Sequence, residues 1–441
     1  MRQACDVAVI GGGPAGSTAA STLASMGWKV TLFEKARHPR FHIGESLLPM
    51  NMPVLKELGV FEEVQKIGVY KPGAEFCDPD PRKAPHRFFF RDALDKGYPD
   101  AYQVRRDQFD EILLRNAARK GAQVLEEHRV TKLAFAEGQP TVLTVRDAAD
   151  EVQEWEARYV VDASGRDTVL GNHFRIKRKN MRHGSAAIFG HFRNVPREEG
   201  ENGGLISISW FPHGWTWTIP LQDGITSVGA VCDPEYLKSR DCSPAEFLQR
   251  TLALCPSNVQ ERMSGAEQVG EVRATGNYSY ACDRMVFPGA VLVGDAWAFV
   301  DPVFSSGVLL GMRSAQRASK YIDAYLRNDL AQAELLQEEF EKQTRRSVKI
   351  FSWMIARFNS PAIRHLFSHP ANPFRVQEAV TSMLAGDIDR SNGVLPRLLY
   401  FRSIYYLYCF ALLPKAIREW RHRSRRAQTE FRGGTTEVDA A

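Results

Sequence analysis

Three glycines near the start of the chain have the spacing of a phosphate-binding loop. An apolar, strand-like run over residues 6–10 leads directly into the hexapeptide Gly11-Gly12-Gly13-Pro14-Ala15-Gly16. Gly11 permits a tight turn, Gly13 allows the backbone to approach a pyrophosphate, and Gly16 lets the following helix pack against a sheet. The N-terminus of that helix offers unpaired N–H groups and the positive end of a dipole to phosphate oxygens. This segment, Ala15 included, therefore predicts a dinucleotide-binding site.

An acidic residue follows at the distance that a ribose contact requires. Small residues continue the predicted helix towards Gly27, and a second apolar run over residues 29–33 ends at Glu34. Glu34 lies eighteen positions beyond Gly16, where a carboxylate can accept hydrogen bonds from ribose hydroxyls. Strand, glycine loop, helix, strand and acid thus occur in the order of a nucleotide-binding unit.

Later motifs resemble those of FAD-dependent enzymes. The run 291–296 contains Gly294 and Asp295 and resembles the second FAD-contacting motif of flavoproteins of the glutathione-reductase type, in which the aspartate binds the ribityl hydroxyls. Residues 159–165 resemble the middle strand and loop of the same fold, and Arg106 matches an arginine that reaches the cofactor. These separated motifs, in this order, imply that the cofactor is FAD rather than NAD.

Four more segments together resemble the flavin-dependent halogenases, in particular the branch that acts on phenols, pyrroles and indoles. They are the loop Gly44-Glu45-Ser46, Lys71 within residues 70–76, the run Gly-Trp-Thr-Trp-Thr-Ile-Pro at 214–220, and the run Asp-Pro-Val-Phe-Ser-Ser-Gly at 301–307. The resemblance implies an oxidoreductase that uses reduced FAD (FADH2), O2 and chloride or bromide. These would form hypohalous acid, HOX, for electrophilic halogenation of an electron-rich aromatic ring.

The resemblance also implies a role for each group of residues. The loop 44–46 would cover one side of the isoalloxazine and, with Pro302, belong to the cofactor site. Backbone N–H groups of Ser306 and Gly307 would hold the halide, as an anion site made of oriented amides. Lys71 would receive HOX, because its ammonium can donate a hydrogen bond that polarises the acid, while its neutral amine could instead form a haloamine.

Trp215 and Trp217 share one face of a sheet if their segment is a strand, because residues two apart point the same way. In the family, two indoles beside the flavin would keep the substrate from direct contact with it. Only a small diffusible oxidant would then pass. The alternative is that both residues are core tryptophans of an antiparallel sheet.

Phe304 separates this chain from the family members that halogenate free tryptophan. Those enzymes carry a glutamate at this position, and its carboxylate helps to stabilise or deprotonate the cationic intermediate. Phe304 cannot do so. The substitution favours an indole, phenol or pyrrole over free tryptophan. This ring could be a free molecule or could be tethered to an acyl carrier protein.

Other functions share part of this pattern. An FAD-dependent aromatic hydroxylase, a monooxygenase of the same superfamily, would have the same cofactor motifs. A prenyl-lipid reductase would share the phosphate loop but leaves Lys71 and the tryptophan pair unexplained. A flavin-binding protein that only docks a partner would retain FAD and make no product.

Composition limits the possible partners. The net charge of +5 over 441 residues is too small to indicate binding of nucleic acid. The seven cysteines are scattered without a Cys-x-x-Cys pair, which predicts neither a disulfide framework nor a metal site and favours a reduced cytoplasm. No second nucleotide motif is visible for a nicotinamide, so we expect a separate NAD(P)H-dependent flavin reductase as a partner.

We expect neither a signal peptide nor a membrane-spanning segment in this sequence. Residues 1–10 run straight into a predicted core strand, so no signal peptide is expected. The most apolar stretch, residues 404–413, is shorter than the roughly 20 residues of a membrane span.

The motifs and the length predict a mixed α/β protein of more than one domain. Residues 1–325 are expected to form the halogenase core, with FAD-binding parts at 1–75, 100–175 and 275–325 and a substrate sheet from 76–99 and 176–274. Strand-like runs at 185–192, 205–211, 215–221 and 225–231, separated by turn residues, predict that this sheet is antiparallel. The resemblance implies the FAD-binding fold of the glutathione-reductase-2 type, as in p-hydroxybenzoate hydroxylase.

Residues 326–441 predict a helical C-terminal region with a basic tail. Its last charged block contains Arg418, Arg421, Arg423, Arg425 and Arg426. Such a block fits a solvated helix end, and it also fits a docking face for an acidic carrier protein or an anionic membrane surface.

Overall fold

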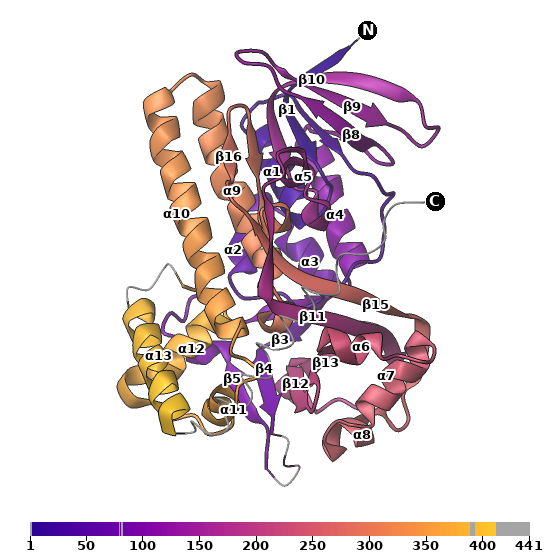
Figure 1. Ribbon diagram of the computed structural model, residues 1–441, viewed down its shortest axis with the longest axis vertical. Helices are drawn as coiled ribbons and strands as arrows, with labels where there is room; N and C mark the ends of the chain where they lie inside the picture. The colour runs from indigo at the N-terminus through magenta and orange to yellow at the C-terminus, as the bar shows by residue number, and fades with distance from the viewer. Residues whose placement is uncertain (1, 79, 81–82, 389–392, 412–441) are drawn as a thin grey trace. The chain divides into compact units, whose positions relative to one another are not determined.

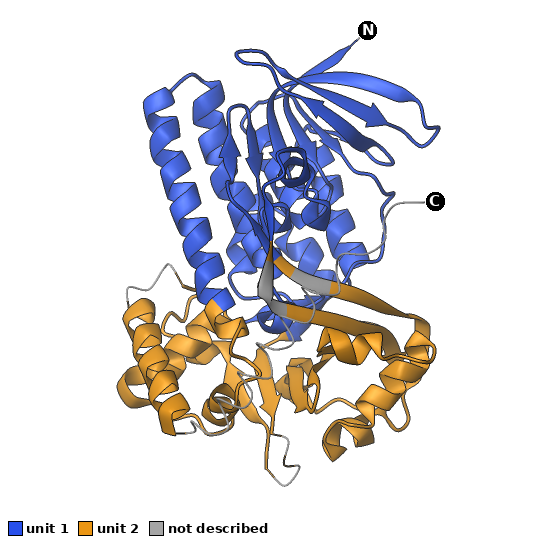
Figure 2. Cartoon of the chain, viewed as in Figure 1, with its two compact units in different colours: residues 1–70, 100–178, 280–352 blue, residues 71–99, 179–279, 353–441 orange. Residues whose placement is uncertain are grey.

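The computed structural model describes residues 2–78, 80, 83–388 and 393–411, and the chain divides into two compact units (Figure 1, Figure 2). The first unit takes residues 1–70, 100–178 and 280–352, and the second takes residues 71–99, 179–279 and 353–441. Each unit is therefore assembled from three stretches that are far apart in the sequence. The division into a halogenase core, residues 1–325, and a C-terminal region, residues 326–441, is a functional one and stays a prediction.

The first unit is built on a parallel sheet. Its strands have the order β16-β17-β10-β1-β2-β7, and β8 and β9 extend it antiparallel beside β10. The strands are β1 (Gln3–Ile10), β2 (Val30–Phe33), β7 (Gln123–Leu125), β8 (Arg129–Ala134), β9 (Thr141–Arg146), β10 (Val152–Asp162), β16 (Val286–Phe287) and β17 (Ala290–Leu292). A separate pair joins β3 (Gly68–Lys71) to β6 (Ala101–Val104). Strands β2 and β17 are buried throughout, as expected for a parallel sheet covered on both faces.

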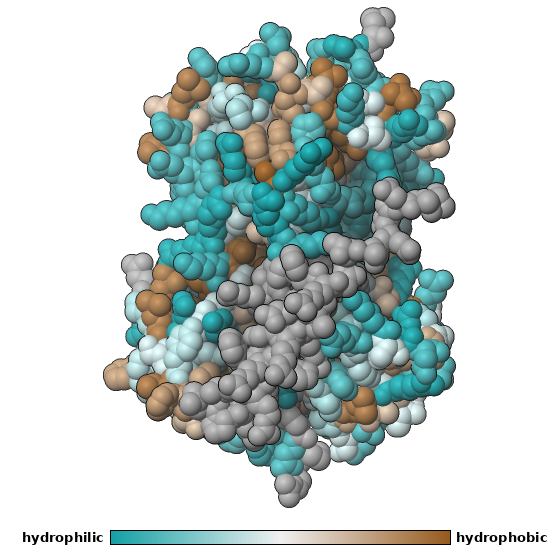
Figure 3. Space-filling view, in the orientation of Figure 1, coloured by the Kyte–Doolittle hydropathy of each residue, from teal (hydrophilic) through white to brown (hydrophobic). Residues whose placement is uncertain are grey.

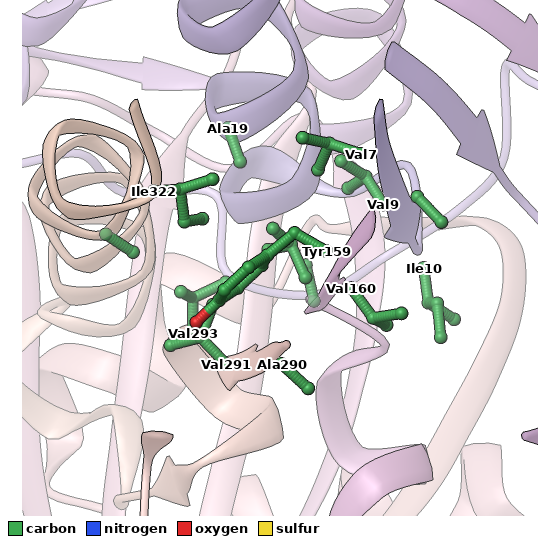
Figure 4. Packing of buried hydrophobic residues seen from close by; sticks show 14 of the residues in the cluster. Val7, Val9, Ile10, Ala19, Tyr159, Val160, Ala290, Val291, Val293 and Ile322 are labelled. Atoms are coloured by element: carbon green, nitrogen blue, oxygen red, sulfur yellow. The ribbon is translucent and has the colours of Figure 1, made fainter. Parts of the chain in front are cut away.

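Helices α1 (Pro14–Ser25) and α4 (Arg106–Arg119) contact strands of this sheet. The first unit also contains α2 (Asn51–Leu58), α3 (Phe61–Ile67), α5 (Val169–His173), α9 (Gly307–Leu326) and most of α10 (Leu330–Ile355). Helix α1 contacts both α4 and α9. Figure 4 shows Ala19 of α1 and Ile322 of α9 in one buried cluster with Val7 and Val9 of β1 and with Tyr159 of β10. This core fixes the N-termini of α1 and α9, which carry the predicted cofactor and halide residues.

The second unit contains most of an antiparallel sheet. The sheet has the order β18-β15-β11-β14-β13-β12-β4-β5, and β12 and β4 are its parallel neighbours. The strands are β4 (Gly73–Cys77), β5 (His86–Phe89), β11 (Lys177–Arg193), β12 (Ile206–Phe211), β13 (Gly214–Pro220), β14 (Thr226–Cys232), β15 (Glu267–Cys282) and β18 (Ala298–Phe299). The four strands expected between residues 185 and 231 are confirmed as β11 to β14.

The two faces of this sheet have different cores. One face buries Ile188, Val228 and Ala230 with Phe247 and Leu248 of α7. Three helices follow β14 in the sequence: α6 (Pro234–Lys238), α7 (Pro244–Leu252) and α8 (Ser257–Met263). The other face is aromatic, and there Phe76 and Trp210 pack with Phe358 and Phe367 from the C-terminal part of the chain. The tryptophan pair of β13 lies on this aromatic face.

The described residues after 326 are mostly helical. Helix α10 begins at Leu330 and is followed by α11 (Pro361–Ser368), α12 (Val376–Leu384) and α13 (Val394–Ala411). Helix α13 exposes Leu407 and Phe410, and Figure 3 shows hydrophobic residues scattered among hydrophilic ones on the visible face. Within the described part of the chain no helix is both long and apolar enough to cross a membrane. The basic block 418–426 lies outside the described residues.

Substitution of Gly16 by alanine should destabilise the first unit. A Cβ atom at Gly16 would overlap the carbonyl oxygen of Gly11 and lie 3.2 Å from Cβ of Ala163. Because backbone cannot move aside as a flexible side chain can, we expect a loss of about 1–3 kcal/mol in the free energy of unfolding. Urea unfolding of the Gly16→Ala variant measures this loss.

The matched control is Gly13→Ala, where a Cβ atom would approach only Nη2 of Arg40, at 3.8 Å. With FAD removed from both proteins, this variant should unfold at nearly the same urea concentration as the wild type. Equal stability of the two variants would show that the contact between α1 and the glycine loop is not tight.

Candidate active site

The glycine loop forms an open cradle at the N-terminus of α1. Gly11 has φ +104°, a left-handed conformation that favours glycine, and a Cβ atom there would overlap the carbonyl oxygen of Ala163. Gly13 is the residue that precedes α1, and Pro14 occupies the first helical position, where its missing N–H is not needed. The space beside Gly13 and the free N-terminal amides of α1 fit a pyrophosphate.

Glu34 is buried at the end of β2 and is bound to the loop itself. Its Oε2 accepts a hydrogen bond from the backbone N–H of Gly12 at 2.6 Å, and its Oε1 accepts one from Ala36 at 2.9 Å. These bonds fix the carboxylate next to the glycine loop. Each carboxylate oxygen can accept a further bond, so a ribose hydroxyl can still be recognised.

The Gly44-Glu45-Ser46 loop is attached to β6. The N–H of Val104 donates to the carbonyl of Glu45 at 2.8 Å, and Ser46 forms a β-bridge with Gln103. Gly44 has φ +106°, and a Cβ atom on it would lie 3.0 Å from Nη1 of Arg106. Glycine is therefore required here both for the backbone conformation and for the arginine.

Arg106 connects this loop to the second FAD motif. It is buried, it donates to the carbonyl of Ile43 at 2.8 Å, and its Nε forms an ion pair with Asp110 at 2.7 Å. Burial raises the pKa of the Asp295 carboxyl to about 6, and the charges of Arg106 and Arg166 oppose this rise. Asp295 is thus mostly ionised at neutral pH and can accept hydrogen bonds from ribityl hydroxyls.

The two FAD motifs meet at the start of α1. Gly294 has φ +57°, and a Cβ atom on it would lie 3.1 Å from Cα of Gly311 in α9 and 3.3 Å from Cβ of Ala15. The N–H of Gly294 also donates to the hydroxyl of Ser314 at 2.9 Å. Small residues at these positions bring the Gly-Asp motif, α1 and α9 into direct contact.

The predicted halide residues form the N-terminus of α9. Ser306 precedes the first residue of this 20-residue helix, and Gly307 is the first. The hydroxyl of Ser306 is buried, and no group in the described residues hydrogen-bonds to it. Gly307 is exposed, and a Cβ atom on it would meet no atom within 4 Å. An unsatisfied donor, free amides and open space together fit a small anion.

The turn before α9 positions these residues. The carboxylate of Asp301 accepts from the N–H of Val303 at 3.2 Å, and Ser305 takes a left-handed conformation with φ +56°. Pro302 is exposed at the start of this short turn, and Phe304 is buried within it. Phe304 therefore belongs to the protein interior.

Lys71 is a fully buried lysine in the second unit. Its Nζ lies 5.2 Å from the centre of the Phe90 ring, a cation–π distance. The N–H of Phe90 donates to the carbonyl of Pro72 at 2.8 Å, which holds the ring next to the lysine. Burial lowers the pKa of the Lys71 ammonium to about 7. Ammonium and neutral amine are therefore both populated at neutral pH, which is uncommon for lysine.

Trp215 and Trp217 lie side by side on β13. Their ring centres are 5.9 Å apart, and both side chains are buried. Nε1 of Trp217 donates to Oγ of Ser227 at 3.2 Å, and Trp215 packs edge-to-face with Phe358 at 6.0 Å. The prediction that they share a face is confirmed.

The structure therefore groups the predicted residues by unit. The first unit brings together all residues predicted to bind FAD or halide: Gly11, Gly13, Ala15, Gly16, Glu34, Gly44, Glu45, Ser46, Arg106, Gly294, Asp295, Pro302, Ser306 and Gly307. The second unit holds Lys71, Trp215 and Trp217. The chemical roles of these residues stay predictions.

Two arginines escaped the sequence analysis. The Arg40 guanidinium faces Gly13 and forms ion pairs with Glu34 at 3.9 Å and Asp110 at 3.4 Å. Arg166 lies 5.1 Å from the ring centre of Phe299 and lowers the pKa of Asp295 against the effect of burial. Neither residue lies in one of the recognised motifs, so only the folded chain reveals them.

Comparison with known proteins identifies the family. A family model described as an FAD binding domain matches residues 4–352. The tryptophan 2-halogenase of Chondromyces crocatus is 34% identical over 331 residues, which cover 74% of this chain and 62% of that protein. The 1H-pyrrole-2-carbonyl-[peptidyl-carrier protein] chlorinase of Pseudomonas fluorescens is 32% identical over 408 residues, which cover 87% of this chain and 89% of that protein.

A solved structure agrees with these matches. The myxobacterial chondrochloren halogenase CndH is 32% identical, with a TM-score of 0.74 over 89% of this chain and 92% of that one. The match thus spans less than two thirds of the tryptophan 2-halogenase but most of the pyrrole chlorinase. The match to the FAD binding domain, together with the glycine loop at the N-terminus of α1, identifies the chain as an FAD-binding flavoprotein. The chain belongs to the flavin-dependent halogenases, a family of FAD-dependent oxidoreductases.

Gly13→Ala should lose FAD without unfolding. The protein itself leaves room for the added methyl group, but a pyrophosphate held by the α1 amides would not. We expect FAD affinity to fall by at least about tenfold, which corresponds to about 1.4 kcal/mol of binding free energy. Titration of the apoprotein with FAD, followed by flavin fluorescence, measures the change. Wild-type affinity in a folded Gly13→Ala variant would contradict the pyrophosphate assignment.

Proposed function

We propose that this protein is an FADH2-dependent halogenase that installs chlorine or bromine on an electron-rich aromatic ring. The observation that carries the proposal is the N-terminus of α9, where the unsatisfied hydroxyl of Ser306 and the amides at Gly307 offer an anion site within the FAD-binding unit. A hydroxylase needs no halide, so such a site favours halogenation. In the overall reaction a halogen replaces one aromatic hydrogen, and both atoms of O2 leave as water.

The residues of the first unit would hold the cofactor and the halide. Bound reduced FAD supplies the two electrons that activate O2. The α1 amides would bind its pyrophosphate, Glu34 its ribose and Asp295 its ribityl chain. Ser306 and Gly307 would hold chloride or bromide through N–H and O–H donors, which stabilise an anion without a counter-charge.

Lys71 would receive and orient HOX. The Phe90 ring offsets part of the cost of burying the ammonium, so at and below neutral pH an ammonium that can donate to the oxidant is populated although burial lowers its pKa. The low pKa of about 7 also lets the group lose a proton easily near neutrality. Trp215 and Trp217 would form the wall that separates the aromatic substrate from the flavin.

Substrate and partners follow from the relatives and from Phe304. The pyrrole chlorinase of Pseudomonas fluorescens acts on a ring bound to a peptidyl carrier protein, and by similarity we propose an indole, phenol or pyrrole, free or carrier-tethered. A separate NAD(P)H-dependent flavin reductase would deliver FADH2. The protein and this reductase would both act in the cytoplasm.

The proposal is tested by halide dependence. Purified protein is incubated with FAD, a flavin reductase and NADH, and with or without bromide or chloride, across indole, phenol and pyrrole panels. We expect products that are heavier by one halogen and absent without halide. Hydroxylated products that form equally with and without halide would instead identify an aromatic hydroxylase.

Replacement of Lys71 by methionine should abolish halogenation and leave flavin chemistry intact. Methionine keeps the apolar volume of the buried side chain, so the sheet should still fold. We expect product formation to fall by at least about a hundredfold, typical of a lost acid–base group. The rate of O2-dependent oxidation of FADH2 should be unchanged. Wild-type yields from Lys71→Met would remove this lysine from the mechanism.

The pH dependence of product yield should report the lysine. Because its pKa is about 7, the ammonium is lost as the pH rises through 7, and halogenation per flavin oxidised should fall over that range. HOBr is a weaker acid than HOCl. If ionisation of the oxidant caused the fall in the pH profile, that fall would therefore move to higher pH when bromide replaces chloride. A fall that stays at the same pH with both halides indicates Lys71, and one that moves argues against it.

Free tryptophan should be a poor substrate. Phe304 supplies no carboxylate to the cationic intermediate, and one electrostatic group is typically worth about 3 kcal/mol in the transition state. Competition between free tryptophan and indole, phenol and pyrrole panels, at equal concentration and equal FADH2 supply, measures the preference. Faster halogenation of tryptophan than of every other ring would overturn this interpretation.

A further inference from the structure

One glycine of the strand next to the tryptophan pair is not required by its backbone conformation. Gly229 occupies the middle of β14, and it is not among the glycines with positive φ. Glycine weakens a strand interior, so its presence in a buried sheet marks a place where another group approaches closely. The backbone of Gly229 could carry any side chain, and only the space above it is restricted.

The group that occupies this space is the indole of Trp217. Trp217 and Gly229 are directly opposite each other across β13 and β14. A Cβ atom on Gly229 would overlap Cζ2 of the indole and lie 2.6 Å from its Cη2. It would also lie 2.5 Å from Cβ of Phe189, which is opposite Gly229 on the other side, in β11. The six-membered ring of the indole therefore lies on the bare backbone of β14.

A second residue of β14 holds the other end of the same indole. Ser227 is two residues before Gly229 and so lies on the same face. Its hydroxyl, fully buried, accepts the hydrogen bond from Nε1 of Trp217 at 3.2 Å. Without this acceptor the buried indole N–H would lose its partner, which is unfavourable. Gly229 thus permits one position of the ring, and Ser227 selects it.

We propose that Gly229 and Ser227 are positioning residues that fix the indole of Trp217 in one orientation on the sheet. This inference rests on the proposed function, in which Trp217 separates the aromatic substrate from the flavin. A wall works only if its ring stays in one orientation. The pattern Ser-x-Gly in β14 is then as necessary to the wall as the Trp-x-Trp pattern in β13.

The orientation of Trp217 can be measured by ¹⁹F NMR of protein labelled with 5-fluorotryptophan. Fluorine at this ring position adds no bulk at the atoms that face Gly229. The chain has eight tryptophans, and the resonance of Trp217 is assigned by its absence from Trp217→Phe. We expect Gly229→Ala and Ser227→Ala each to shift or broaden this resonance. Ser227→Thr keeps a hydroxyl acceptor, so the Trp217 resonance of this variant should stay at its wild-type position.

The matched control is Gly190→Ala in β11. A Cβ atom there would meet a methyl group of Val272 at 3.0 Å, on the face opposite Phe189, and so tests the general effect of a glycine-to-alanine change in this sheet. We expect the Trp217 resonance to stay in place. Because Phe lacks the outer indole atoms, Trp217→Phe should also reduce the loss in Tm that Gly229→Ala causes, and the part that comes from overlap with Cβ of Phe189 should remain.

The functional readout is halogenated product per flavin oxidised. We expect this ratio to fall at least about threefold in Gly229→Ala and Ser227→Ala, and to remain at the wild-type value in Gly190→Ala. A Trp217 resonance that does not change in either variant would overturn the positioning assignment, whatever the activity. A shifted resonance with an unchanged ratio would also overturn it, because the orientation would then serve only packing. Wild-type protein that makes no halogenated product overturns the proposed function instead.

Discussion

The close approach of α1 to its own glycine loop is the contact on which the first unit depends. Gly16 packs against the carbonyl of Gly11, and Gly294 packs against Ala15 of the same helix. These contacts leave no room for larger side chains, so they fix the N-terminus of α1 at the end of β1. The same junction includes Gly311 of α9, so the helix that begins at Gly307 is held against the Gly-Asp motif of the first unit.

Several charged side chains of the first unit are buried in the protein interior. Glu34, Arg106 and Asp110 are all buried, and each forms a hydrogen bond or an ion pair of 2.6–2.7 Å. Because buried charges are unfavourable unless they are paired, these networks fix the side chains before a ligand arrives. Such preorganisation lets a binding site hold a large cofactor at a low entropic cost.

The second unit uses burial for a different purpose. Lys71 is fully buried beside the Phe90 ring, and this burial lowers the pKa of its ammonium to about 7. On the aromatic face, rings from β4, β12, β13 and the C-terminal segment around α11 pack together. Rigid aromatic packing suits a barrier, since rings in contact on several sides have few alternative rotamers.

The sequence by itself determined the elements whose residues are neighbours in the chain. The glycine turn before α1, the strand that ends just before Glu34, the turn at Gly294 and the strands around Trp217 could be predicted because local spacing dictates turns, helix starts and strand alternation. Length and motifs also indicated an FAD-binding fold, and the comparisons bear this out.

Only the tertiary structure decided the features that depend on groups distant in sequence. The approach of Arg40 to Gly13, the low pKa of Lys71 and the support of Trp217 by Gly229 and Ser227 have no local pattern. Each arises where the fold places side chains from separate segments against one another. Burial and close packing are properties of that arrangement, and no single stretch of the chain encodes them.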